Sequence, residues 1–206
     1  MATSIPYPLE LHTQRLLIRS PEEADASEFE HALAESIETL RPWLAWAQSI
    51  PTLDEARESC RQARARFEQN EDHRLHLYLK DAFLQGTRTL VGCSGLHRID
   101  WSVPKGEIGY WVRASYTSKG YITEAVQEIT RFAIEDLGMK RVEIRMNTAN
   151  HKSRHIAERL GFTHEGTLRN DMRHTDGSLR DTHIYARTST FRPLTQPTNA
   201  SPNQRS

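Results

Sequence analysis

The chain has 206 residues, of which 37% are hydrophobic and 26% are charged. At roughly 150 residues per domain, this length favours one domain with decorated ends and a core of ordinary size. The 27 basic residues balance the 27 acidic residues, which excludes the strong positive field of a bulk nucleic-acid binder. No apolar run approaches the ~20 residues of a membrane span, and residues 1–10 lack a signal-peptide pattern. We therefore expect neither a membrane nor a nucleic acid as partner.

The cysteine content indicates a reducing compartment. Cys60 and Cys93 are the two cysteines of the chain, and they form neither a short metal-ligand spacing nor a disulfide framework. We expect a cytoplasmic protein with no metal ion.

The N-terminal part is predicted to hold a strand followed by a helix. After an extended lead-in over residues 1–10, Leu11–Arg19 has the composition of a strand. Ser20, Pro21 and Glu23 suit an N-cap, a first helical turn and a capping box. An apolar stripe at helical spacing follows: Ala26, Phe29, Leu33, Ile37 and Leu40.

A second helix is predicted after an aromatic segment. Thr52 and Glu55 form a capping box, and the stripe behind it is Leu53, Ala56, Cys60, Ala63 and Phe67. The segment Pro42–Ala47 precedes this helix and contains Trp43, Leu44 and Trp46. Such a cluster is usually part of the core, and we expect it to be core here.

The rest of the chain alternates strand and helix patterns. From His73 the apolar period changes to two, which is that of a strand. The predicted strands are His73–Lys80, Thr87–Ile99, Gly106–Val112, Arg141–Met146, Phe162–Leu168 and Asp181–Arg187. The clearest helix is Tyr121–Leu137, which stops before Gly138, and a shorter helix covers His151–Leu160. Prolines and small polar residues over 189–206 indicate a disordered tail.

One strand–loop–helix junction has the features of a phosphate site. The strand Glu107–Val112 is followed by the polar loop Arg113–Lys119, then Gly120 and the long helix. A helix N-terminus offers unpaired N–H groups, and a glycine there lets a phosphate approach closely. An ordinary connection with a permissive glycine explains this segment equally well.

A second unit follows at a fixed distance from this junction. Asn150, Ser153, Ala157, Gly161 and Phe162 describe a helix with an N-cap and a glycine just past its end. A capped helix explains three of these residues, but not the position of the unit after a junction of the phosphate type.

Together these segments resemble a known family. Glu107–Ala125, Arg141–Arg145 and Asn150–Gly166 look like the acetyl-CoA motifs of the GNAT superfamily of N-acyltransferases. More narrowly, they resemble its RimJ/RimL type, the ribosomal-protein N-terminal acetyltransferases. The resemblance covers roughly residues 10–188 and implies an N-acetyltransferase domain over 11–188. It implies an α/β (α+β) fold: a mixed, mostly antiparallel twisted sheet with helices on both faces and splayed central strands.

The resemblance assigns acetyl-CoA, as co-substrate, to particular residues. Gly120 matches the pyrophosphate loop of the superfamily, whereas Thr117, Ser118 and Ile122 depart from its pattern. The residues assigned to acetyl-CoA are Trp111, Val112, Thr117, Ser118, Lys119, Gly120, Tyr121, Ile122, Asn150 and Ser153. Many members place a tyrosine general acid where this chain has Ala157, so Ser153 is the candidate to stabilise or protonate the leaving thiolate.

The implied reaction is direct transfer of acetyl to a primary amine, most readily a protein or peptide N-terminal α-amino group. The resemblance favours Glu107 as general base, and Asp100 and His97 are its rivals on the preceding strand. A backbone N–H at the end of Glu107–Val112 would hold the charge that develops on the carbonyl oxygen.

Two alternative functions stay open at this point. A small-amine or drug N-acetyltransferase would use the same scaffold, and a non-enzymatic acyl-CoA-binding regulator would account for the departures at Thr117 and Ile122. Relatives with the aromatic segment often dimerise, so a homodimer is also possible.

Overall fold

The computed structural model describes residues 5, 7–173 and 176–188. Within them one eight-stranded sheet has the strand order β1-β2-β3-β4-β5-β6-β8-β7. All neighbouring strands are antiparallel except β5 and β6, which are parallel. The strands are β1 (Glu10–His12), β2 (Leu16–Arg19), β3 (His73–Leu79), β4 (Leu90–Asp100), β5 (Lys105–Val112), β6 (Arg141–Asn147), β7 (Thr163–Arg173) and β8 (Leu179–Arg187). The mixed, mostly antiparallel sheet is therefore confirmed.

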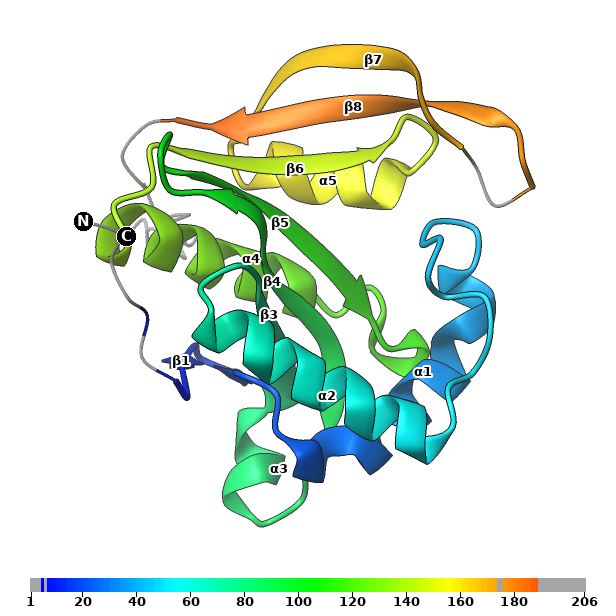
Figure 1. The fold of residues 1–206 in the computed structure, drawn as a ribbon, viewed down its shortest axis with the longest axis vertical. Helices are drawn as coiled ribbons and strands as arrows, with labels where there is room; N and C mark the ends of the chain where they lie inside the picture. Colours follow the sequence, from blue (N-terminus) through cyan, green and yellow to red (C-terminus); the bar gives the residue numbers. More distant parts are fainter. Residues whose placement is uncertain (1–4, 6, 174–175, 189–206) are drawn as a thin grey trace, which may run out of the picture.

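The two central strands separate soon after they meet. β5 and β6 pair through Lys105 with Arg141, Gly106 with Val142, and Glu107 with Glu143. Beyond that point the two strands run on without pairing to each other, and they diverge (Figure 1). This divergence leaves the facing strand edges free, as expected for splayed central strands.

Helices cover both faces of the sheet (Figure 1). α1 (Ala26–Leu40) and α2 (Leu53–Glu68) lie on one face, and α4 (Tyr121–Arg131) lies on the other. α4 continues into a π-helical turn, Phe132–Asp136. The remaining helical elements are Glu23–Asp25 (η1), α3 (Lys80–Leu84), Ala114–Tyr116 (η2) and α5 (His151–Arg159).

Each face of the sheet has its own core. Ile108 of β5 is buried in the core under α4, whereas Trp111 of the same strand is buried in the core under α1. Because side chains alternate along a strand, β5 contributes to both cores.

The first predicted strand is in fact a hairpin. The chain turns back between β1 and β2, with the Thr13 amide donating to the Leu16 carbonyl at 3.0 Å and the Leu16 amide donating to Thr13 Oγ1 at 2.9 Å. The prediction of one strand was wrong because the turn at residues 13–15 is short and contains neither Gly nor Pro to mark it.

The first helix starts later than predicted. Ser20 does not cap it, because its hydroxyl accepts the Leu9 amide at 3.0 Å. A capping box does form, but from Glu22 and Asp25 on η1, and α1 begins at Ala26. The capping box at Thr52 and Glu55 is confirmed, although Leu53 of its predicted stripe is 39% exposed.

The aromatic segment is core only in part: Ala47 is buried in the core under α1 and Leu44 packs against it, but neither tryptophan belongs to that cluster. Trp46 is 56% exposed, and Trp43 and Leu44 are half-buried. The predicted tail, 189–206, lies outside the described residues. Among the described helices, none combines the length and apolarity needed to cross a membrane.

Candidate active site

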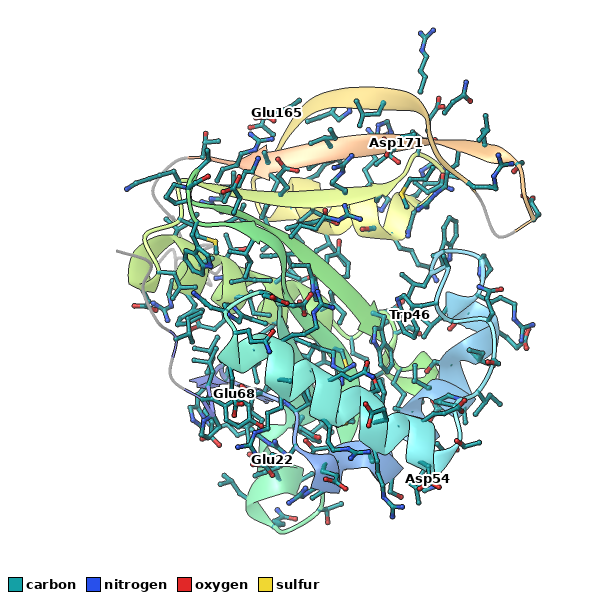
Figure 2. All side chains as sticks on the ribbon, in the orientation of Figure 1. Glu22, Trp46, Asp54, Glu68, Glu165 and Asp171 are labelled. Atoms are coloured by element: carbon teal, nitrogen blue, oxygen red, sulfur yellow. The ribbon has the colours of Figure 1, made fainter. Side chains whose placement is uncertain are left out.

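A large open groove lies where β5 and β6 diverge. It has a volume of about 1290 Å³. One wall is the segment between α1 and α2, where Figure 2 labels Trp46, and the other comes from β7 and β8, where Figure 2 labels Asp171. Its floor includes the predicted residues Glu107, Trp111, Asn150 and Ser153. The structure thus brings the sequence-predicted base and the sequence-predicted acid into one cavity.

Glu107 lies at the last paired position of β5 and β6. Its side chain is 18% exposed and forms a 2.7 Å ion pair with Arg98, whose own side chain is 60% exposed. Burial raises the pKa of Glu107, while the charge of Arg98 opposes the increase. A carboxylate with a raised pKa is a stronger base than an ordinary one.

The two rival bases differ in their surroundings. Asp100 accepts hydrogen bonds from the Ser102 hydroxyl and from the Ser102 and Val103 amides, and these bonds lower its pKa. This carboxylate caps a turn and does not line the groove. His97 does line the groove, and its Nδ1 lies 2.9 Å from the Asp72 carboxylate.

Ser153 forms a pair with a residue that the sequence analysis did not select. The Tyr110 hydroxyl lies 2.7 Å from Ser153 Oγ and 3.2 Å from the Ser153 carbonyl oxygen. Burial raises the pKa of the Tyr110 phenol, so the phenol stays protonated. The alternation of the strand Glu107–Val112 already placed Tyr110 on the face opposite Glu107, but nothing in the sequence placed that face against α5.

Asn150 is the N-cap of α5, as predicted. Its Oδ1 accepts the Ser153 amide at 3.1 Å. Asn147, at the end of β6, is buried, lines the groove and uses its Oδ1 to accept the Ala149 amide at 2.8 Å. Both amide side chains therefore fix the turn that holds Ser153 beside Tyr110.

The predicted phosphate loop lies outside the groove lining, at the start of α4. Gly120 is the N-cap with φ +80°, and Ser118 also has a positive φ, +60°. The Glu124 amide donates to the Gly120 carbonyl, so the amides before it are those that a helix leaves unpaired. Ile122 is buried in the core under α4, which gives its side chain a packing role.

Arg15 joins this loop from the hairpin between β1 and β2. Its guanidinium donates to the Lys119 carbonyl at 3.0 Å, pairs with Glu124 at 2.6 Å and lies 4.5 Å from the centre of the Tyr121 ring. No local pattern in the sequence connects these two segments, because over a hundred residues separate them.

Residues 15–163 match the family described as Acetyltransferase (GNAT) domain. The chain belongs to this family. It is 31% identical over 173 residues to YdaF of Bacillus subtilis (strain 168), a protein named as a ribosomal N-acetyltransferase, covering 84% of this chain and 91% of that protein. It is 30% identical over 98 residues to the ribosomal-protein-serine acetyltransferase of Escherichia coli (strain K12), covering 48% and 54% of the two chains.

Solved structures show the same fold. The structure of RimL, a ribosomal L7/L12 α-N-protein acetyltransferase in complex with coenzyme A, superposes with a TM-score of 0.80 at 18% identity, covering 88% of this chain and 99% of that one. A structure described as a probable acetyltransferase has a TM-score of 0.79 at 27% identity, covering 87% and 97%.

As a GNAT acetyltransferase, this chain is an N-acetyltransferase that uses acetyl-CoA. The structure fits that co-substrate in two places: the free edges of β5 and β6 beside the groove, and the glycine-capped N-terminus of α4. The tyrosine of many GNAT members is absent, because its position is occupied by Ala157, which is fully buried. A phenol is nevertheless present, because Tyr110 reaches Ser153 from β5.

Proposed function

We propose that this chain acetylates the N-terminal α-amino group of a protein. The observation that carries the proposal is the groove, whose volume of about 1290 Å³ exceeds the ~300–1,000 Å³ of a typical small-molecule pocket. Its walls leave room for an extended peptide as acceptor. The names of the bacterial relatives, which refer to ribosomal proteins, support the same acceptor class.

The chemistry at the floor of the groove suits an α-amino group. A peptide α-amino group has a pKa of about 7.7–8.0, so it is largely protonated at neutral pH and must lose a proton before it attacks. Glu107, with its pKa raised by burial, accepts that proton directly or through one water. Alternate amides of residues 108–112 of β5, those that do not pair with β4, point toward the edge left free by β6, where the acetyl carbonyl can accept from them.

Departure of the thiolate is assigned to the opposite face of β5. Ser153 and Tyr110 share a hydrogen bond of 2.7 Å, so one hydroxyl can donate to sulfur while the other stabilises it. Amine activation and thiolate protonation thereby occur on different sides of the same strand.

A thiol-release assay tests the proposal. The acceptors are peptides with a free N-terminal serine or alanine. Two kinds of control are used: peptides whose α-amine is blocked and whose only primary amine is that of a lysine side chain, and small primary amines. We expect release of coenzyme A with the free peptides alone. Equal rates with small amines would contradict the proposal, and so would the absence of turnover with every acceptor.

A further inference from the structure

His97 reaches the same part of β5 that holds the rest of the site. It pairs with Glu107 across β4 and β5, so both side chains share a face of the sheet. Its ring leans over Gly109, because a Cβ on Gly109 would lie 3.0 Å from His97 Cδ2 and 3.2 Å from His97 Nε2. The missing side chain of Gly109 therefore lets the imidazole approach β5 one residue before Tyr110.

Asp72 fixes the orientation of this imidazole. Its carboxylate lies 2.9 Å from His97 Nδ1. Burial acts to raise the pKa of Asp72, but the hydrogen bond from His97 and the nearby charges of His97, Arg66 and Arg74 together lower it. An ionised carboxylate only accepts hydrogen bonds, so Nδ1 is the donor, and in the neutral form of the ring the acceptor nitrogen is Nε2, which lies over Gly109.

The reaction needs more than one proton acceptor. An ammonium group loses one proton to become a nucleophile. After the nitrogen has bonded to the carbonyl carbon it carries a positive charge and must lose another. Glu107, as proposed above, takes the first proton, and that assignment leaves the second without an acceptor.

We propose that His97 Nε2 accepts the second proton from the reacting nitrogen, with Asp72 as its positioning residue. The N–C bond forms as the π electrons of the C=O bond move to oxygen, and the nitrogen proton passes to Nε2. The C=O bond then re-forms as the C–S bond breaks with its electron pair on sulfur. The sulfur takes a proton from the Ser153–Tyr110 hydroxyl pair, which solvent restores, and His97 returns its proton to solvent. The inference rests on the proposed function for the assignment of the first proton to Glu107.

Several charged groups surround this imidazole. Arg66 of α2 lies 3.6 Å from the Asp72 carboxylate, and Arg98 is held by Glu107. The groups that face His97 and Asp72 from the adjoining elements are Arg66, Arg74, His73, Glu107 and Arg98. The pH profile of any His97 variant must therefore be compared with the wild-type profile.

The test compares His97→Gln with Glu107→Gln at two pH values, on an amine that the wild type accepts. At neutral pH both variants should lose roughly 10²–10⁴-fold in kcat/KM, the range of general-base catalysis. Near pH 9 the α-amine is already neutral, so Glu107→Gln should recover most of its loss. His97→Gln should not recover, because the second proton still has to leave.

Two further variants complete the experiment. Asp72→Asn should show a smaller loss with the same pH course as His97→Gln. His31→Gln changes an exposed histidine of α1 outside the groove and should keep wild-type rates. Calorimetry should give unchanged acetyl-CoA affinity, and thermal unfolding an unchanged Tm, for His97→Gln.

Recovery of His97→Gln at high pH, or a wild-type rate at neutral pH, would overturn the inference. Failure of the proposed function has a different signature: the wild type would then prefer amines other than peptide α-amines. The His97 comparison uses whichever amine the wild type accepts, with the higher pH set above the pKa of that amine, so the two failures are distinguishable.

Discussion

At the scale of single residues, the sequence indicated those members of the candidate site whose position follows from their own strand or helix. Asn150 caps α5, as predicted, and Glu107 lies in the groove, where its role as base stays a prediction. Tyr110, Asp72 and Arg15 were not selected, because each acts on a residue of another element. Their roles depend on pairings that no local spacing encodes.

Glu107→Gln keeps the shape of the side chain and removes the base. We expect kcat/KM to fall by roughly 10²–10⁴-fold at neutral pH, with acetyl-CoA affinity unchanged. Burial raises the pKa of Glu107, so the carboxylate protonates earlier as the pH falls, and wild-type activity should decline on the acid side at a higher pH than for an exposed glutamate. A wild-type pH–rate profile in the variant would move the assignment away from Glu107.

Ser153→Ala and Tyr110→Phe separate the two members of the hydroxyl pair. If both serve the leaving thiolate, each variant should lower kcat more than it changes the affinity for acetyl-CoA, and the double variant should lose less than the product of the single losses. Steady-state kinetics with calorimetry checks this. Wild-type kcat in Ser153→Ala together with a lowered Tm would assign Ser153 to helix packing alone.

At the scale of elements, helices with a strong apolar stripe and a cap were predicted well. α2 begins after Thr52 with its capping box formed, and α4 begins at Tyr121. The predicted elements were wrong where contacts with distant parts of the chain determine the local structure. The hairpin of β1 and β2 was predicted as one strand. Its turn is held by Glu124 of α4, whose carboxylate accepts the Arg15 amide at 2.8 Å.

Gly120→Val tests whether the start of α4 binds the phosphates of acetyl-CoA. Gly120 has φ +80°, which a β-branched residue adopts only with strain, and a side chain there would obstruct a phosphate. We expect weaker acetyl-CoA binding by calorimetry. Gly86→Val is the matched control, because Gly86 has φ +82° and a Cβ at that position would have no neighbour within 4 Å. Equal affinity in both variants would contradict the phosphate assignment.

At the scale of the whole molecule, the sequence predicted the sheet and its splayed strands but not the groove. The core beneath α4 follows from apolar periodicity, whereas the groove depends on how far the α1–α2 segment stands from β7 and β8. Trp46 shows the limit of the pattern. An aromatic cluster usually indicates core, yet this side chain is 56% exposed beside the groove.

Trp46→Ala tests whether the groove is the acceptor site of the whole molecule. An aromatic contact worth about 1 kcal/mol corresponds to roughly a fivefold change in affinity. We therefore expect the KM of a peptide acceptor to rise about that much, with the KM of acetyl-CoA unchanged. Leu84→Ala is the control, because Leu84 is 76% exposed on α3 and does not line the groove. Light scattering on the same samples tests the possible homodimer: a lower mass for Trp46→Ala than for the wild type would place Trp46 in a subunit interface and contradict its assignment to the acceptor.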